Sequence, residues 1–397
     1  MAHLLWLTPF PPAAGRSAGA GRMLELIRRL AHRHRVDVLS FVDDEGEAET
    51  ERALREAGAA GVRLVRRRPD RRPDWLGLRP AAVAEYRDPA MAGALADTLA
   101  RERSDVLQVE YTPMAMYAPG RGAIRMVWTI HELGTARLRR ERARRRGPVR
   151  ALLAYRGLQM LHFELSHAAR FDRVVVIAAD EADELRRRGA GVPLDVSPMG
   201  ADTRALAPVP GVVEEPGLVV FVGFFGHEPN VDAARWLATD VLPRVRAVVP
   251  GAHAALVGRD PTPAVEALAA PGAVEVTGFV PDLRPWLARA QAVVVPVREG
   301  GGVRGKVVEA WAAGRPVVST RLGCAGLDAR DGENVLLAED ADGLARQIAR
   351  CLRDATLRRA LGARGRETAV ARYDWDGIAA AHDAMYAELL DRRGRAA

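Results

Sequence analysis

Residues 293–320 read VVVPVREGGGVRGKVVEAWAAGRPVVST, and this stretch decides the fold class. A buried apolar run ends at Pro296, a glycine-rich loop follows it, and residues 305–313 then space their apolar side chains as a helix does. A second apolar run, residues 316–320, comes directly afterwards. This order of strand, glycine loop, helix and strand predicts one unit of a parallel, doubly wound α/β sheet.

The same alternation of strand and helix runs through the whole chain. In the first half, short apolar runs predict strands at residues 4–8, 36–42, 62–65, 105–109, 124–130, 173–177 and 194–197, with a first helix at 21–32. In the second half they predict strands at 218–222, 254–257, 274–277, 292–296 and 316–320. The helices there are expected at 232–249, at 305–313, at 341–371 with a break near Asp354, and at 375–390. The fold class is therefore α/β, with two halves of comparable size.

The length of 397 residues favours two domains, because single cores stop growing near ~250–300 residues. Residues 206–217, LAPVPGVVEEPG, lack a helical period and predict an interdomain linker. We expect a first domain at 1–205, a second at 218–372, and a terminal helix within 373–397 that packs back toward the first domain. Ligands of parallel sheets bind outside the carboxyl ends of the strands, so the cleft between two such domains is the expected site.

Composition excludes several classes of protein. Hydrophobic residues make up 48% and charged residues 27%, a globular balance, and no apolar run reaches the ~20 residues that span a bilayer. The N-terminus has no basic leader or cleavage site, and only Cys324 and Cys351 are present, which predicts a cytoplasmic protein without disulfides. The net charge of +7 is concentrated in residues 1–210. This half favours an anionic partner, unless its many arginines only solvate the surface.

The glycine loop at 300–305 has the composition of a phosphate-binding site. Glycines let backbone amides approach phosphate oxygens at the positive end of a helix. Arg304 and Lys306, the only lysine of the chain, add two positive charges at the same place. Glu309 follows Lys306 by about one helical turn, where a carboxylate can accept hydrogen bonds from ribose hydroxyls. An ordinary strand, turn and helix with surface charges is the alternative.

The run GGGVRGKVVEAWAAGRPVVST closely resembles the donor-binding segment of glycosyltransferase family 4. The resemblance extends from residue 218 to about 376, through VVFVGFFGHEPNVDAARWL and VTGFVPDLRPWLARAQAVVVP, and more weakly through LLWLTPFPP, EYTPMAMY, TIHE and SPMGADT. It implies a GT-B fold, in which two Rossmann-like doubly wound domains face a central cleft. It further implies metal-independent, retaining transfer from a nucleotide-sugar donor, UDP- or GDP-linked. The match is best to a subgroup that assembles exopolysaccharide and cell-surface glycans.

The carry-over of family residues is partial. Glu309 matches the second Glu of the family's E-x7-E motif, which binds the donor ribose, whereas the first Glu position holds Gly301 and Glu299 lies two residues away. The loop at Gly223 lacks the Arg and Lys of many members, so Arg304 and Lys306 are expected to carry the pyrophosphate charge and to act in catalysis. Further donor contacts are expected from three groups of residues. They are the glycine-loop residues Glu299, Gly300, Gly301, Gly302 and Val303, Gly223 in the loop after the first strand of the second domain, and the base-reading residues Phe279 and Val280.

The N-terminal half supplies a second set of candidates. The loop PPAAGRSAGAGR, with Gly15, Gly19 and Gly21, matches the family's glycine loop near the donor phosphate and the acceptor. A dinucleotide fingerprint is the rival interpretation, but Leu24 occupies its third glycine position. His131 ends a predicted strand, and the resemblance makes it a catalytic contact to the donor sugar or the acceptor. Glu110 also ends a strand, where a functional and a structural role are equally open.

The expected partners follow from these residues. They are a nucleotide-sugar donor and a hydroxyl acceptor, which a lipid could carry, with no further cofactor and no metal. The basic run RLRRERARRRGPVR at 137–150, beside an apolar helix, could lie on an anionic membrane, or it could be a solvated helix face. Aromatic residues are only 5%, which argues against nucleic acid. A small-molecule glycosyltransferase, a nucleotide-sugar epimerase and a non-catalytic GT-B protein are the alternative functions.

Overall fold

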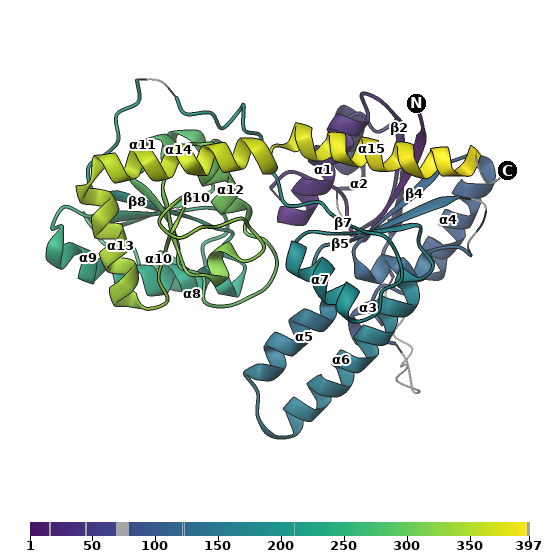
Figure 1. Cartoon of the computed structure of the whole chain (residues 1–397), viewed down its shortest axis with the longest axis horizontal. Coiled ribbons are helices and arrows are strands. Elements are labelled where there is room, and N and C mark those ends of the chain that lie inside the picture. The colour runs from purple at the N-terminus through teal and green to yellow at the C-terminus, as the bar shows by residue number, and fades with distance from the viewer. Residues whose placement is uncertain are drawn as a thin grey trace. The chain divides into compact units, whose positions relative to one another are not determined.

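A computed structural model describes residues 1–394, apart from residues 16, 44–45, 69–78, 121, 123 and 210. The chain divides into two compact units (Figure 1). Unit 1 comprises Met1–Pro198 and Ile378–Ala397, and unit 2 comprises Met199–Gly377. Each unit is built on one parallel sheet with helices, so the predicted class of two Rossmann-like α/β domains is confirmed.

Within the described residues, unit 1 holds a sheet of seven parallel strands in the order β3-β2-β1-β4-β5-β6-β7. The first strand is central, because Leu5 pairs with Asp37 on one side and with Leu107 on the other. Both faces of the inner strands are buried, which explains their unbroken apolar runs. The strands are β1 (His3–Thr8), β2 (Arg35–Val42), β3 (Gly61–Arg66), β4 (Val106–Glu110), β5 (Arg125–Ile130), β6 (Arg173–Val176) and β7 (Leu194–Val196).

Helices cover this sheet and build its core. Met91 of α4 and Phe163 of α6 belong to one buried cluster with Leu107 and Trp128 of the strands. The helical elements of unit 1 are α1 (Ala18–Leu30), α2 (Glu47–Glu56), α3 (Ala81–Ala84), α4 (Pro89–Arg101), η1 (Thr112–Tyr117), α5 (Gly134–Ala143), α6 (Gly147–Ala168), α7 (Ala179–Arg187) and most of α15 (Trp375–Gly394). The first helix starts where a polar cap allows it, since the Ser17 hydroxyl accepts a hydrogen bond from the Ala20 amide at 3.1 Å.

Over the part of the chain that the structure describes, unit 2 holds six parallel strands in the order β10-β9-β8-β11-β12-β13. They are β8 (Leu218–Val222), β9 (His253–Val257), β10 (Val274–Gly278), β11 (Ala292–Val295), β12 (Val317–Ser319) and β13 (Leu336–Leu337). The helical elements are α8 (Glu228–Trp236), η2 (Leu237–Val241), α9 (Leu242–Val248), α10 (Pro263–Glu266), α11 (Arg284–Arg289), α12 (Gly305–Ala312), η3 (Leu322–Cys324), α13 (Ala341–Arg353) and α14 (Ala355–Arg372).

Two details refine the predicted helices of unit 2. The predicted break near Asp354 is confirmed, because this residue ends α13 and its carboxylate accepts the first amides of α14 at 2.9 Å. The single helix expected at 232–249 is instead α8, the π-helical turn η2 and α9. Pro243 has no amide to donate to the preceding turn, which explains the change of hydrogen-bond pattern there.

The boundary between the units lies at Pro198–Met199, earlier than the linker predicted at 206–217. Ion pairs explain why the described part of this segment belongs to unit 2. Glu214 pairs with Arg315 at 2.9 Å and with Arg358 at 3.0 Å, and Glu215 pairs with Arg289. The acids that suggested a linker therefore fasten it to one domain. From Ile378 onward, α15 is part of unit 1. Among the described helices, none combines the length and apolarity needed to cross a bilayer.

Candidate functional site

The order of strands in unit 2 reverses between β8 and β11. These strands pair directly, with Val219 opposite Ala292, although β9 and β10 lie between them in sequence and continue the sheet on the far side of β8. The loops that leave the carboxyl ends of β8 and β11 therefore diverge at this point. Such a topological switch point is where open parallel sheets bind their ligands. The glycine loop predicted from the sequence is the loop that follows β11.

Lys306 lies in the first turn of α12 and reaches across this switch point. Its Nζ donates a hydrogen bond to Oδ1 of Asn230 in the first turn of α8, at 2.8 Å, and lies 4.4 Å from the centre of the Phe221 ring. The amide of Asn230 is oriented in turn by its own bond to the Phe224 carbonyl at 2.8 Å. Burial, and second the charge of Arg304, lower the pKa of Lys306 to about 7, against the opposing effect of Glu309.

Glu309 lies one turn further along α12 and is partly buried. Burial raises the pKa of its carboxyl above the usual value, and the charge of Lys306 offsets part of this rise. Of the hydrogen bonds and ion pairs seen among the described side chains, none involves this carboxylate. A carboxylate in this state has acceptor capacity left for a ligand's hydroxyl groups.

Arg304 precedes α12 and folds back on its own loop. The guanidinium donates to the carbonyl oxygens of Gly301 at 2.5 Å, of Gly302, and of Glu299 at 3.3 Å. In this state it organises the loop, whereas the sequence predicted that it would carry phosphate charge. Gly300 and Gly302 have φ of +92° and +76°, which explains why glycine occupies these positions.

The remaining donor-side candidates lie around the same loop. Gly301 and Glu299 are exposed, and Val303 is half-buried. Among the described side chains none caps the N-terminus of α12, and a helix N-terminus in this state is suited to bind an anion.

The loops after β8, β9 and β10 form the neighbouring wall. The Gly223 amide donates to Val257 at 2.9 Å, and a side chain at Gly258 would meet the Gly223 carbonyl oxygen at 1.7 Å. The two loops therefore approach as closely as backbones can. Phe279 follows β10 and is 71% exposed, whereas Val280 packs partly against the core. A flat, exposed ring beside two tight loops is suited to contact a base.

In unit 1 the strand order reverses between β1 and β4, and the predicted residues gather there. His131 follows β5, is 7% exposed, and donates from Nε2 to Oε2 of the fully buried Glu110 at 2.6 Å. Tyr111 stacks on the imidazole with ring centres 3.8 Å apart. Its φ of 69°, rare for a residue with a side chain, is a strained conformation of the kind that clusters at functional sites. The pair Glu110 and His131 thus forms a rigid unit at the carboxyl end of the sheet.

Only one of the three predicted glycines of unit 1 contacts this group. A side chain at Gly19 would meet the Tyr111 hydroxyl at 1.8 Å and Nδ1 of His131 at 3.0 Å. A side chain at Gly21 or Gly15 would meet nothing within 4 Å, although Gly15 has φ of +70° and serves the loop. The close approach of α1 to the His131 ring therefore depends on Gly19.

A buried polar network fixes the charge of Glu110. Burial favours the neutral carboxyl, but the hydrogen bond and charge of His131, the charge of Arg22 and the bond from Gln108 lower the pKa of Glu110 below its usual value. Burial also lowers the pKa of His131, which leaves the imidazole neutral with its proton on Nε2. Arg22 is fully buried and donates to Ser197 Oγ at 2.6 Å.

Two more carboxylates hold the loop that follows His131. The fully buried Glu164 accepts the Gly134 amide at 2.7 Å and the Thr135 hydroxyl, and Glu181 accepts the Leu133 amide at 2.9 Å. Burial raises the pKa of Glu164 and of Glu181 to about 7. The start of α5 is thereby tied to α6 and α7, three residues from the imidazole.

The sequence analysis missed two of these residues. Asn230 gives no signal of its own, because its contact with Lys306 depends on the order of the strands. Arg22 does give a signal in the sequence, because it lies four residues before Leu26 and thus on the apolar face of α1. An arginine on such a face must find polar partners inside the protein.

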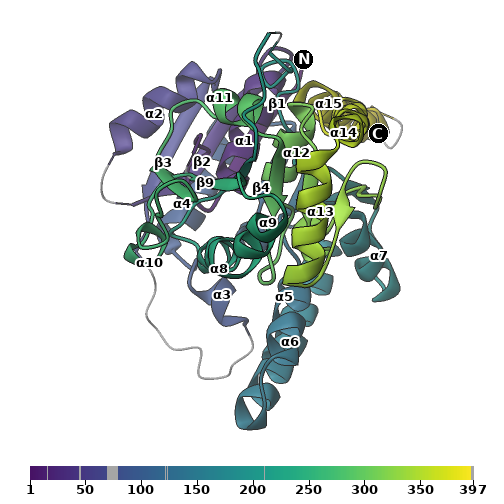
Figure 2. The same ribbon diagram turned by 90° about the vertical axis from the view of Figure 1, so that its left-hand side faces the viewer.

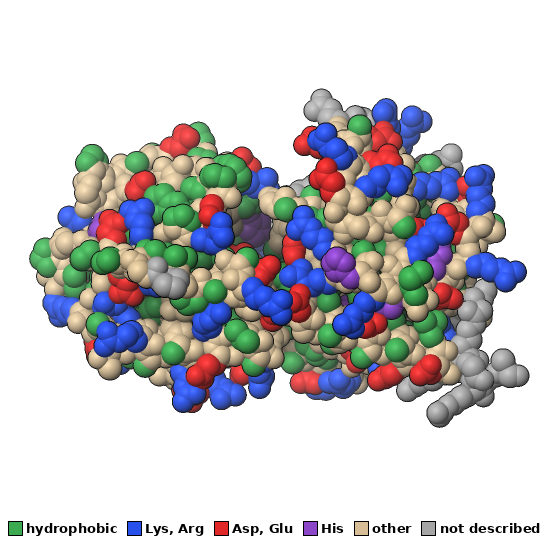
Figure 3. Space-filling view, turned by 90° about the horizontal axis from the view of Figure 1, so that it is seen from above, with side chains coloured by type: hydrophobic (Ala, Val, Ile, Leu, Met, Phe, Trp, Pro, Cys, Tyr) green, Lys and Arg blue, Asp and Glu red, His purple; other side chains and the backbone are tan. Residues whose placement is uncertain are grey.

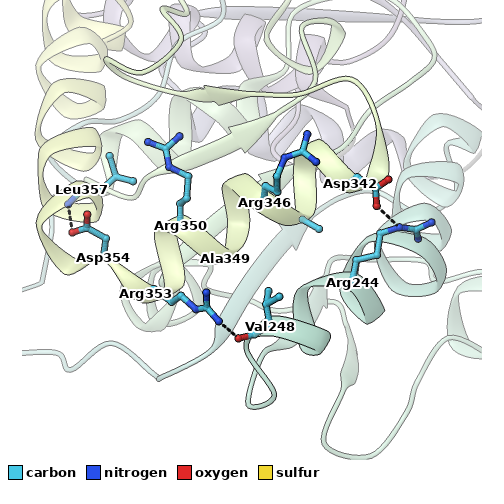
Figure 4. A pocket seen from close by; sticks show the side chains of 10 residues that line it. Arg244, Val248, Asp342, Arg346, Ala349, Arg350, Arg353, Asp354 and Leu357 are labelled. Carbon is cyan, nitrogen blue, oxygen red and sulfur yellow. Dashed lines mark hydrogen bonds and ion pairs between the residues drawn. The ribbon is translucent and has the colours of Figure 1, made fainter.

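Charged side chains also gather at two places away from the switch points of the described chain. A pocket lies on unit 2 between α9 and α13, lined by Arg244, Val248, Asp342, Ala345, Arg346, Ala349, Arg350, Arg353, Asp354 and Leu357 (Figure 4). Its acids already have partners, since Asp342 pairs with Arg244 at 2.8 Å and Asp354 caps α14. Among the described residues, one group has metal-binding spacing: His3, Asp37 and Glu102, whose carboxylates already pair with Arg35. The carboxylates of both places are therefore already engaged by protein groups.

Two family models match the chain, one in each half. Residues 19–205 match the family model "Glycosyltransferase Family 4", and residues 216–354 match "Glycosyl transferases group 1". A stretch of 115 residues, 28% of this chain, is 38% identical to the lipopolysaccharide core biosynthesis glycosyltransferase LpsE of Rhizobium meliloti. The matched stretch spans 33% of that relative.

Solved structures resemble the chain over its whole length. Sucrose-phosphate synthase of Thermosynechococcus elongatus aligns with a TM-score of 0.73 and 20% identity, covering 99% of this chain and 100% of that one. HepE of Anabaena, in complex with UDP-glucose, aligns with a TM-score of 0.67 and 17% identity, again covering 99% and 100%. At this identity the likeness concerns the fold, and it confirms the GT-B class expected from the sequence.

Proposed function

Because the chain belongs to glycosyltransferase family 4, we propose that it transfers a sugar from a nucleotide-diphosphate donor to a hydroxyl acceptor. The observation that carries the proposal is the switch point of unit 2. There a lysine of low pKa, held by Asn230, lies beside a helix N-terminus without a side-chain cap and a carboxylate that bonds to no other described residue. We assign the diphosphate to Lys306 and the α12 amides, the ribose to Glu309, and the base to the loop at Phe279 and Val280.

The charge change of the reaction explains this arrangement. The bond between the anomeric carbon and the diphosphate oxygen breaks, and the nucleoside diphosphate leaves with the electron pair. The acceptor oxygen bonds to the anomeric carbon, and its proton passes to the leaving phosphate. Negative charge therefore grows where Lys306 and the helix dipole lie, so both stabilise the transition state more than the ground state. No metal is needed for this step in our proposal, and configuration is retained because attack occurs on the face of departure.

Unit 1 supplies the second set of groups. We assign His131 to a hydroxyl of the donor sugar or of the acceptor. Glu110 fixes the proton on Nε2, so Nδ1 presents a lone pair at the α1 terminus beside Gly19. In this proposal Glu110 is a positioning residue.

The substrates are proposed by chemistry and likeness. The solved relative HepE holds UDP-glucose, which favours a UDP-hexose as the donor, with a GDP-sugar as the second candidate. The relative LpsE is named for lipopolysaccharide core synthesis, which favours a glycan acceptor carried on a lipid, in surface polysaccharide assembly. A small metabolite is the alternative acceptor.

Thermal shift tests the donor site first. UDP, GDP, ADP, TDP and, as a control, NAD are added to wild type and to Lys306→Met, which keeps the length of the side chain and removes its charge. We expect one nucleoside diphosphate to raise the melting temperature of wild type only. An equal shift in both proteins would refute the assignment of Lys306, and a shift with NAD alone would favour a dinucleotide enzyme.

Turnover then separates the remaining candidates. We expect the stabilising nucleotide's sugar to be transferred to an added hydroxyl acceptor, with donor hydrolysis slower than transfer. Conversion of the donor without an acceptor would identify an epimerase. Binding without any turnover on surface-glycan or small-molecule acceptors would identify a non-catalytic member.

A further inference from the structure

Helices α5 and α6 of unit 1 form a two-helix arm that extends away from the sheet (Figure 1, Figure 2). The turn between them is Arg144-Arg145-Arg146, and it lies at the far end of the arm. The root is anchored by Glu164, whose carboxylate accepts the first amides of α5. Leu138, Leu153 and Met160 pack between the two helices in a small buried cluster. The root of the arm thus belongs to the core and supports the His131 loop, whereas the part from Arg142 to Leu158 contributes to neither.

The arm holds the excess positive charge of the protein. Residues 134–160 contain nine arginines and one glutamate, a net charge of +8, whereas the whole chain carries +7. All other residues together therefore sum to −1. On the face of the molecule shown in Figure 3, basic and acidic side chains are intermixed. Summed over the rest of the chain, acids therefore balance the basic residues, whereas in the arm they do not.

Most of this charge is available at the surface. Arg139 pairs with Glu184 at 2.7 Å and Arg140 pairs with Glu132, both near the root. Toward the tip, four arginines have guanidinium groups that make no ion pair or hydrogen bond with another described residue: Arg142, Arg145, Arg146 and Arg150. All but Arg142 are exposed.

Apolar side chains lie beside these arginines. Val149, Leu152, Tyr155 and Leu158 of α6 are 50%, 47%, 52% and 67% exposed. They recur every three residues and so form an inclined ridge that winds around about half of the helix, while Leu153 and Met160 pack against Leu138 of α5. An exposed apolar ridge within a block of positive charge is the pattern of a helix that lies in a lipid interface.

We propose that the α5–α6 arm docks on an anionic bilayer, with the arginines of the tip at the lipid phosphates and the ridge Val149–Leu158 among the acyl chains. A second copy of this chain fits the arm less well, because two surfaces of charge +8 repel each other. Nucleic acid would use the arginines but leaves exposed aliphatic side chains without a partner. Docking would bring the enzyme to a lipid-borne acceptor, and it does not depend on the proposed transfer reaction.

Sedimentation with vesicles tests the proposal on the full chain. Wild type should bind vesicles of phosphatidylcholine and phosphatidylglycerol, bind phosphatidylcholine alone weakly, and dissociate as salt screens the charge. Arg145→Gln/Arg146→Gln should lower the partition coefficient roughly 30-fold, since each basic residue at an anionic surface contributes about fivefold. Leu152→Ser/Leu158→Ser should weaken binding at every salt concentration, because it removes apolar contact and leaves the charge unchanged.

The matched control removes the same charge elsewhere. Arg346→Gln/Arg350→Gln deletes two exposed arginines from the α13 pocket of unit 2 (Figure 4) and should leave vesicle binding unchanged. The proposal is overturned if wild type ignores anionic vesicles, if both pairs weaken binding equally, or if Leu152→Ser/Leu158→Ser dissolves a dimer instead. Nucleotide-induced thermal shift, measured on the same variants, should stay at the wild-type value, which separates failure here from failure of the donor site.

Discussion

Donor affinity should fall as the pH rises through the pKa of Lys306. In the free protein this pKa is lowered to about 7, first by burial and second by Arg304. A nucleotide sugar keeps its two negative charges from weakly acidic to weakly alkaline pH, so the lysine is the group that changes. If the diphosphate binds only the protonated ammonium, each molecule that has lost the proton must regain it before binding.

The size of the effect follows from this single proton. At about pH 6 about nine-tenths of the protein carries the charged lysine, at about pH 8 about one-tenth, and at about pH 9 about one-hundredth. The dissociation constant should therefore rise about tenfold between pH 6 and pH 8, which is about 1.4 kcal/mol, and about ninetyfold by pH 9. The rise continues until the pH passes the higher pKa that Lys306 has in the complex.

Titration calorimetry with UDP-glucose, or with whichever donor the thermal shift selects, measures this curve. Lys306→Met should bind the donor more weakly than wild type at pH 6, and its dissociation constant should not change with pH. Asn230→Asp places a carboxylate at the partner atom, now 2.8 Å from Nζ, and should move the onset of the slope up by about 1–3 pH units. An affinity that is constant from pH 6 to pH 9, or a slope that Lys306→Met retains, would refute the reasoning.

Two further predictions concern unit 1. In Gly19→Ala the new Cβ would meet the Tyr111 hydroxyl at 1.8 Å, so this variant should displace the Tyr111 ring and lower kcat, with little loss of melting temperature. Gly21→Ala, whose Cβ meets nothing within 4 Å, should stay active. Equal activity of the two variants would show that Gly19 is not part of the site. In the folded protein the pKa of Glu164 is raised from 4.5 to about 7, so folding favours the protonated carboxyl. The stability that this proton contributes is complete below about pH 4.5 and is lost as the pH rises through 7. Relative to wild type, Glu164→Gln should gain up to about 3 kcal/mol in free energy of unfolding between about pH 4.5 and pH 7, measured by urea denaturation; a difference independent of pH would contradict this.

Local sequence patterns were sufficient to predict the fold. The strands of both units are short runs of Val, Leu and Ile because both faces of a parallel sheet are covered, and such runs stand out between polar helices. The unit boundary was not predictable in the same way. A segment rich in Pro, Gly and acid looks like a linker until its partners are known, and Glu214 finds two of them, Arg315 and Arg358, about 100 and 144 residues away.

The residues of the candidate site were also predictable only where they are close together in the sequence. The glycine loop, Lys306 and Glu309 are adjacent in sequence, so their spacing alone placed them together. Asn230 is 76 residues from Lys306, and only the pairing of β8 with β11 makes them neighbours. Arg304 shows the converse, because a charge that sequence assigned to a ligand is engaged by its own loop carbonyls. A contact of this guanidinium with the phosphate requires the loop carbonyls to release it.

Both units use the same construction at the point where strand order reverses. In unit 2 the helix after the first strand, α8, contacts the first turn of α12 through Asn230 and Lys306. In unit 1 the helix after the first strand, α1, contacts Tyr111, the residue after β4, through Gly19. At a switch point the two loops diverge and leave room for a ligand, so a contact that bridges them fixes the size of that room. Asn230 bridges the loops with a polar side chain, which a charged ligand can displace or join. Gly19 allows the close contact in unit 1 because it has no side chain. The first is therefore the contact expected to respond to a ligand, and the second the one expected to remain fixed.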